Sequence, residues 1–481
     1  MQKTRKVVKT LKDKKKLSCA SIYKALIYVL PGVLCLSFYP VIKLGSSESM
    51  NYELSLPLIW LAIFDVVTLV MMIQKKRLIG GFSKKLVWLL FPGFLTISVL
   101  WSLNFTRGLL TVGILWLICF AVYGMWELRS VLKEKRFKDR FWKVFFGSYL
   151  VVCVWCVVQC IMDLEGVSRE ARLMCAGCTY RMFGFPHPNG FAIEPQFMGN
   201  LLLAPAIVSA WKAMDRKKYL ILFFIFSVGI FLTFSRGAIY AFVVAMIFMM
   251  AMERVRRKVW GVCKIFFVIA VAFVFTLNLQ GAMAAMSPTN DTYVSGVAKV
   301  LNHLSLGIID IRGTEENGGE AATVEEAQSD EPETPSDNEG ERAVFDGYVE
   351  ESTDTRVKLS GAAIEVWRKD PKAILVGVGL GGAGQALYVN GLSSSPKEIV
   401  QNEYASLLLE TGLIGVILII LTLVLIIRVM QKSMAMPMLL TMLVAYGITL
   451  MFFSGLPNAL HIYLLTGLFV ALSCNLALNN K

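Results

Sequence analysis

About a dozen apolar runs, each long enough to cross a lipid bilayer, constrain this chain more than any other feature of its sequence. A transmembrane helix needs about 20 predominantly apolar residues. Only one long polar segment, roughly 281–402, interrupts these runs. They are continuously apolar and do not alternate as the strands of a membrane barrel do. The sequence therefore predicts an all-α integral membrane protein, which agrees with a composition of 56% hydrophobic and 17% charged residues.

We predict twelve transmembrane helices, an even number that places both termini on the same side of the membrane. The spans are Ala25–Val41, Leu56–Ile73, Leu86–Leu103, Gly108–Trp126, Val144–Met162, Phe191–Trp211, Tyr219–Phe234, Gly237–Met252, Val259–Leu279, Tyr404–Ile427, Met436–Phe453 and Ala459–Leu478. The chain then divides into residues 1–279 with helices 1–9 and an exterior loop at 163–190, an exterior loop at 280–403, and residues 404–481 with helices 10–12.

The distribution of basic residues predicts which side is cytoplasmic. Most of the 48 Lys and Arg residues lie in the N-terminal segment and in five short connectors on one side of the membrane. By the positive-inside rule these connectors and both termini are cytoplasmic, and the long loop lies on the opposite face. The net charge of +13 is thus a topology signal. Nucleic-acid binding is the weaker interpretation, because the basic residues are scattered and form no single patch.

The ten cysteines do not make a disulfide framework. Cys153, Cys156 and Cys160 recur at helical spacing inside one span, which favours packing over metal binding. Cys175 and Cys178 stand in the exterior loop, where they form either a local disulfide or two free thiols. Zinc requires four ligands, and no second pair of cysteines accompanies them.

The long exterior loop changes composition along its length. Residues 310–354 hold 16 Asp or Glu against two Arg and almost no large apolar residues. Such a stretch cannot bury enough surface to fold, so we predict that it is disordered and solvated. Its carboxylates do not follow the spacing of a calcium-binding loop, and we assign it no chemistry.

Three exterior segments carry groups that are unusual beside a membrane. Arg236 lies in T-F-S-R-G, which joins two apolar runs with essentially no loop, and a cation so close to hydrocarbon is costly unless it snorkels or is paired. Arg356 begins a predicted helix on which Val357, Gly361, Ile364 and Trp367 share a face. A glycine-rich turn at 377–384 then permits close approach of the backbone, and it lacks the context of a nucleotide-binding fold.

The third segment, Q-N-E-Y from Gln401, re-enters the membrane, and its polar side chains can cap a helix. Four motifs now occur in order: R-x-x-G-F-x-x-P-N-x-x-A from Arg181, T-x-S-R-G from Thr233, R then W then P-x-x-x-x-x-G-x-G from Arg356, and N-x-Y then L-x-E-x-G-x-x-G after Gln401. Together they resemble the O-antigen ligase and polymerase superfamily, which comprises bacterial inner-membrane enzymes that act on polyprenyl-diphosphate-linked glycans. The resemblance covers Arg181 to about Gly415.

The resemblance implies that Arg236 and Arg356 engage the diphosphate of the lipid-linked donor, without a metal or other cofactor. Guanidinium groups suit this role because they bind phosphate oxygens bidentately and stay charged. We also assign substrate binding to five residues of the motifs: Arg181, Asn189, Ser235, Asn402 and Tyr404.

Gln401 departs from the family pattern, in which many members carry His at this position as a plausible base for the acceptor hydroxyl. Glutamine accepts no proton at neutral pH, so either another group acts as the base or Gln401 only positions the acceptor. The exterior candidates for a base are Glu403, His187, Glu194 and His461.

The resemblance therefore predicts a glycosyltransferase that polymerises undecaprenyl-diphosphate-linked oligosaccharides on the outer face of the bacterial cytoplasmic membrane. Its partners would be the glycan donor, a glycan acceptor and membrane lipid, together with flippase and chain-length regulator proteins; no nucleic acid is expected. A ligase that transfers glycan to a lipid or protein acceptor is the first alternative. A secondary transporter or lipid-linked sugar flippase is the second, which the nearly charge-free spans and the lack of two related halves disfavour.

Overall fold

The computed structural model describes residues 19–36, 41–47, 51–76, 88–174, 186–252, 255, 258–286, 292–305, 348–431, 433, 435–455 and 459–473. Each predicted span contains a helix: α2 (Cys19–Cys35), α3 (Leu56–Gln74), α4 (Leu90–Ser98), α5 (Phe105–Glu127), α7 (Lys135–Leu164), α10 (Pro195–Ala213), α11 (Tyr219–Leu232), α12 (Arg236–Ala251), α14 (Val259–Met286), α19 (Glu403–Gln431), α20 (Met436–Thr449) and α21 (Leu460–Ser473). By length and composition α3, α5, α7, α14 and α19 can cross a membrane, and most of the others are shorter apolar helices. The helical membrane class is confirmed, whereas the count of twelve spans stays a prediction.

A short hairpin corrects the expectation of an all-α chain. Strands β1 (Val41–Ser46) and β2 (Asn51–Ser55) pair antiparallel, with Val41 opposite Ser55. The hairpin fills the link between α2 and α3, and β2 leads directly into α3, whose first turn contains Pro57. Two strands this short carry too weak an alternation to be recognised between two long apolar runs.

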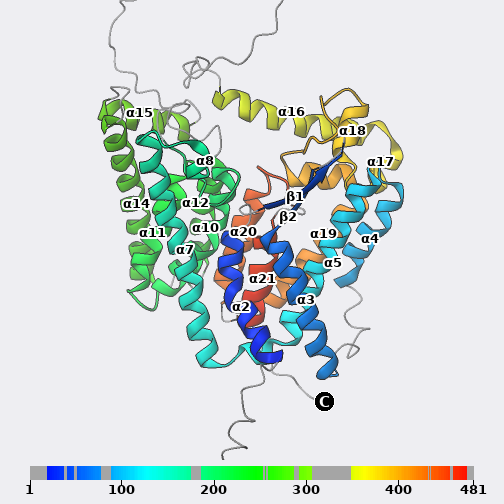
Figure 1. Cartoon of the computed structure of the whole chain (residues 1–481), viewed down its shortest axis with the longest axis horizontal. Coiled ribbons are helices and arrows are strands. Elements are labelled where there is room, and N and C mark those ends of the chain that lie inside the picture. Colours follow the sequence, from blue (N-terminus) through cyan, green and yellow to red (C-terminus); the bar gives the residue numbers. More distant parts are fainter. Residues whose placement is uncertain are drawn as a thin grey trace, which may run out of the picture.

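The helices form two groups with a central set between them (Figure 1). Helices α7, α10, α11, α12 and α14 stand on one side, α3, α4, α5 and α19 on the other, and α2, α20 and α21 lie between. Helix α10 is the most enclosed, since nearly every residue from Met198 to Ala210 is buried. The predicted packing role of Cys153, Cys156 and Cys160 is confirmed, because all three are buried, unbridged members of the main core.

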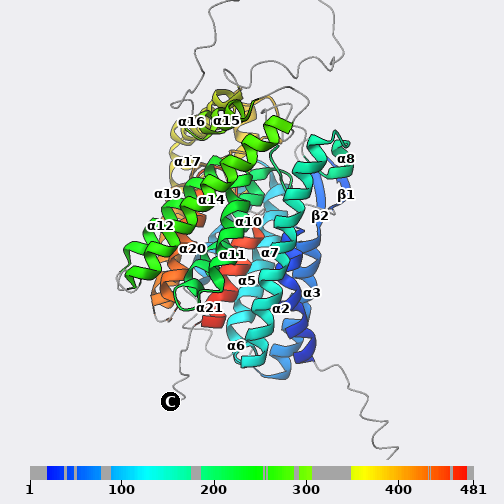
Figure 2. The same cartoon turned by 90° about the vertical axis from the view of Figure 1, so that its left-hand side faces the viewer.

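Four helices gather at one end of the bundle: α15 (Tyr293–Leu304), α16 (Tyr348–Lys369), α17 (Pro371–Val376) and α18 (Ala383–Val389). We call this end the loop face, and α16 lies across it (Figures 1 and 2). Helix α16 begins at Tyr348, inside the stretch predicted to be disordered; residues 306–347 lie outside the described part. Three short elements complete the fold: η2 (Val99–Trp101), α6 (Arg129–Leu132) and α8 (Arg169–Arg172).

Helix α16 packs mainly through residues that lie outside the predicted face. Leu359, Ala363 and Val366 are buried against α18 and the start of α19. On the predicted face Val357 is 64% exposed, whereas Trp367 is partly buried against the same cluster. The packed stripe follows the spacing i, i+4, i+7 of a helix face, and Ala363 at its centre allows close approach.

The glycine-rich turn is a packing device. Gly377, Gly379 and Gly381 all have positive φ angles, and a Cβ atom on any of them would lie within 2.6 Å of a backbone atom of a neighbouring element. The N–H groups of Val378 and Gly379 donate to the carbonyls of Leu409 and Glu410 in α19. Only glycine meets both the conformational and the steric requirement here. The turn therefore ties α17 and α18 to α19 and to the start of α5.

Candidate functional site

Arg236 is fixed at the start of α12 by its own motif. Ser235 is the N-cap residue, and its hydroxyl accepts a hydrogen bond from the N–H of Ala238. The preceding residue, Phe234, has a φ angle of 47°, which a bulky side chain rarely adopts. The T-F-S-R-G motif is thus a tight, strained turn between two helices, and it places the first residue of α12 at the loop face.

Two histidines lie beside this turn. Nε2 of His303, from α15, is 3.1 Å from the Phe234 carbonyl oxygen, and the ring of His187 lies 5.5 Å from that of His303. Burial and the nearby Arg236 lower the pKa of His303 to about 4, and burial, His303 and Arg236 hold the pKa of His187 well below its usual range. Both imidazoles are therefore neutral at pH 7, which leaves Arg236 as the cation of this cluster.

Arg356 lies on α16 and reaches the start of α10. Its Nε donates to Oε1 of Gln401 over 2.9 Å, and its Nη2 donates to Oε1 of Gln196 over 3.0 Å. The Gln196 amide in turn donates to the carbonyl of Phe452, whose ring lies against Gly237 at the start of α12. This chain of contacts connects Arg356 with the residue that follows Arg236. The structure thus places Arg356 and the start of α12 at the two ends of one path of polar and aromatic contacts.

The last three residues of the Q-N-E-Y segment cap α19 or tie it to α20 and to the residues that follow α20. Asn402 Oδ1 accepts from the N–H groups of Tyr404 and Ala405. Glu403 Oε2 accepts from the Ser454 hydroxyl and the Gly455 N–H, and the Tyr404 hydroxyl donates to the Gly447 carbonyl. Gln401 is the exception, since its side chain accepts from Arg356. The structure therefore gives Gln401 a contact that orients an arginine.

The remaining predicted residues lie apart from this contact path. Asn189 is 1% exposed, and its amide bonds to Gln159 and to main-chain carbonyls of its own loop. Glu194 is exposed before α10, and His461 is buried beside Tyr446 in the central set. Arg181 lies outside the described residues, as do Cys175 and Cys178. Substrate binding by Asn189 and Arg181 stays a prediction.

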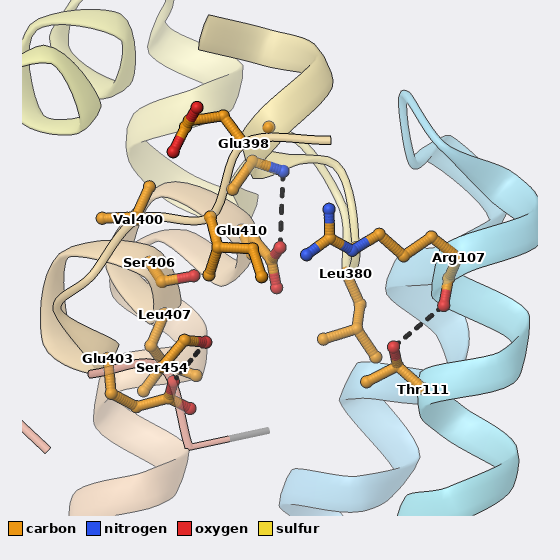
Figure 3. A pocket seen from close by; sticks show the side chains of 14 residues that line it. Arg107, Thr111, Leu380, Glu398, Val400, Glu403, Ser406, Leu407, Glu410 and Ser454 are labelled. Atoms are coloured by element: carbon orange, nitrogen blue, oxygen red, sulfur yellow. Dashed lines mark hydrogen bonds between the residues drawn. The ribbon is translucent and has the colours of Figure 1, made fainter. Parts of the chain in front are cut away.

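A cavity of about 30 Å³ lies next to the Q-N-E-Y segment and is lined by its Glu403 (Figure 3). Its lining includes Arg107 at the start of α5, Glu410 in α19, and Glu403. The side chains of Arg107 and Glu410 point toward one another across it (Figure 3). Glu410 also accepts from main-chain N–H groups of the glycine-rich turn, at Gly381 and Ala383. Among the described residues, no group of three or more His, Cys, Asp or Glu is arranged to hold a metal ion.

The comparison with known families matches a part of the chain that contains both predicted arginines and the Q-N-E-Y segment. Residues 221–420 match the model of the O-antigen ligase family. We call this segment the O-antigen ligase domain, after the family that it resembles. The resemblance inferred from the motifs is confirmed, and the match contains three of the four, the exception being the motif from Arg181. A membrane enzyme of the O-antigen ligase or polymerase type is thereby supported, with a lipid-linked glycan donor and an acceptor in the membrane. No curated protein sequence matches the chain.

Sequence reasoning missed four residues around the O-antigen ligase domain. Gln196 and Phe452 left no signal, because their contacts depend on helices far apart in the chain. Arg107 did leave one, since it is an exterior arginine between two predicted spans, the criterion that selected Arg236. Glu410 is the acidic residue of the L-x-E-x-G motif, and no role was assigned to it.

Proposed function

We propose that this chain is a glycosyltransferase that polymerises undecaprenyl-diphosphate-linked oligosaccharide units into a surface polysaccharide. The observation that carries the proposal is the Arg356 guanidinium held by Gln401 and Gln196, at the end of the bundle where Arg236 begins α12. Two guanidinium groups suit an anion with several oxygens, because each presents a planar fork of N–H donors. The O-antigen ligase domain makes a lipid-linked glycan the appropriate source of that anion.

In this proposal the arginines act on the leaving group. The acceptor hydroxyl oxygen forms a bond to the anomeric carbon of the donor, and the bond from that carbon to the diphosphate oxygen breaks. The electron pair leaves with the polyprenyl diphosphate, so negative charge grows there as the reaction proceeds. Fixed cations stabilise that charge more in the transition state than in the bound donor, which is the condition for catalysis.

The proton of the acceptor hydroxyl needs a base, and we assign this role to Glu403. Its carboxylate lines the cavity next to Gln401, whereas His187 is 5% exposed beneath the loop face. Gln401 is then a positioning residue that acts through Arg356. Ser235, Asn402 and Tyr404 hold the two helix starts in place. Because a diphosphate is already a good leaving group, orientation of the reactants contributes as much as proton removal.

The topology of the proposal follows from the basic connectors. The loop face is extracytoplasmic, both termini are cytoplasmic, and the protein resides in the bacterial cytoplasmic membrane. A flippase would deliver the lipid-linked units to this face, and a chain-length regulator would act on the product.

Purified protein in detergent, supplied with radiolabelled polyprenyl-diphosphate oligosaccharide, tests the proposal. A polymerase should form products of two or more repeat units and release polyprenyl diphosphate, with no membrane gradient present. A ligase would form product only after a separate lipid or protein acceptor is added. A transporter would leave every glycosidic and phosphate bond intact, and that result would overturn the proposal.

A further inference from the structure

The cavity shown in Figure 3 differs in charge from the arginine site, although the two share one segment of chain. Gln401 contacts Arg356. The cavity is lined instead by Val400, the residue before Gln401, and by Glu403, the residue after Asn402. Three glutamates, Glu398, Glu403 and Glu410, line the cavity against the single guanidinium of Arg107. An anionic diphosphate would be repelled here. A neutral group with both hydrogen-bond donors and acceptors fits this lining better.

The arrangement of Arg107 and Glu410 leaves a polar gap. Both side chains point into the cavity, but no N–O distance of 4.0 Å or less joins them, so they form no ion pair in the described part of the chain. Glu410 is held by the glycine-rich turn, and the N–H of Arg107 is tied to Asn104 Oδ1. The Glu410 carboxylate is therefore held by hydrogen bonds from the turn, whereas Arg107 is fixed at its main chain and its guanidinium faces Glu410 without a direct ion pair (Figure 3).

The size of the gap limits what it can hold. One buried water needs about 10–15 Å³ of such volume, so a cavity of about 30 Å³ takes roughly two groups of that size. A whole sugar ring does not fit, but two neighbouring hydroxyl groups on one edge of a ring do. A hydroxyl can donate to the Glu410 carboxylate and accept from the Arg107 guanidinium at the same time.

We propose that this cavity is the acceptor subsite, in which Arg107 and Glu410 bind two adjacent hydroxyl groups of the acceptor sugar. The inference rests on the proposed function and adds the part of the site that selects the acceptor. The Q-N-E-Y segment then separates the two substrates: Gln401 faces the donor arginine on one side, and Glu403 faces the acceptor hydroxyls on the other. Arg107 and Glu410 position the sugar and take no proton.

Arg107→Met tests the subsite, because Met keeps much of the side-chain length and removes every N–H donor. The probes are the lipid-linked repeat unit as donor and the same oligosaccharide, freed of lipid, as acceptor. Losing hydrogen bonds to a charged group should raise the acceptor KM about 10–100-fold. The donor KM should stay at the wild-type value. The acceptor KM of Arg107→Lys should fall between the values of wild type and Arg107→Met. Arg368→Met, at an exposed arginine of α16, should have the acceptor KM of the wild type.

Direct binding of the lipid-free oligosaccharide, measured by saturation-transfer NMR, gives a readout that needs no turnover. Wild type should show binding that Arg107→Met and Glu410→Gln both lose, at unchanged melting temperatures. Equal binding by wild type and Arg107→Met, or an unchanged acceptor KM, overturns the subsite even when the enzyme is active. If the sugar binds in an Arg107-dependent way but the protein has no transferase activity, the sugar site is supported and the proposed function is overturned.

Discussion

Replacing Arg356 with Lys separates the geometry of the guanidinium from its charge. Nε and Nη2 of Arg356 donate to two different glutamines, over 2.9 Å and 3.0 Å, so two separate nitrogens fix the plane of the group. The single Nζ of Lys cannot occupy both positions, and it offers a point charge where the arginine offers a fork. Loss of one preorganised electrostatic contact costs about 10²–10³ in rate. We expect Arg356→Lys to lower kcat about 100-fold, which corresponds to about 2.7 kcal/mol.

The assay is formation of labelled polysaccharide by purified protein, with each variant compared at equal amounts of folded protein. Gln401→Ala should lower kcat by only about 10-fold, because it removes one hydrogen bond to the charged group. Adding Gln401→Ala to Arg356→Lys should cause little further loss, since Gln401 acts through the arginine and the two effects are coupled. Near-wild-type synthesis by Arg356→Lys would refute the diphosphate clamp. Fully additive losses would refute the positioning role of Gln401.

Three further predictions address pH, topology and the acidic stretch. The pKa of His303 is lowered to about 4 from its ordinary 6.5, so the unfolded chain binds the proton first as the pH falls. The melting temperature should therefore drop between about pH 6.5 and 4. In the His303→Gln variant the melting temperature should depend less on pH over this range. A cysteine at Lys372 should react with impermeant reagent added outside spheroplasts, and one at Arg136 should not; labelling in the reverse order would contradict the topology. Deleting residues 315–341 should leave synthesis largely intact, because they match no motif, and loss of synthesis in a normally inserted protein would show otherwise.

The helices could be predicted because a long apolar run is a local property of the sequence. Each predicted span contains a helix, and the termini of α3, α12 and α19 fall within about one turn of the expected positions. The packed face of α16 could not be predicted in the same way. An apolar stripe contacts whichever surface tertiary structure offers, and the stripe of Leu359, Ala363 and Val366 faces helices that begin after it in the chain.

In the candidate site, too, local features of the sequence could be predicted and tertiary contacts could not. Arg236 and Arg356 were recognisable because a cation is costly where the sequence predicts the edge of a membrane, and because motifs surround them. Their partners were not recognisable. Gln196 is 160 positions from Arg356, and its role depends on α10 and α16 meeting at the loop face. Arg107 carried the same signal as Arg236 but stood in no recognised motif, so a physical criterion applied evenly would have found it.

Asn402 shows why structural and functional interpretations of a motif need not be alternatives. Its side chain caps α19 through two main-chain N–H groups, a contact that is worth about 0.5–2 kcal/mol in other helices. That cap also fixes the backbone on both sides of Asn402. Gln401 is thereby turned to Arg356, and Glu403, two residues further along the chain, is turned to Ser454 and lines the cavity. In the proposed reaction a one-residue cap therefore sets the spacing between the leaving group and the attacking hydroxyl. Its value to the enzyme lies in that spacing more than in the stability of the helix.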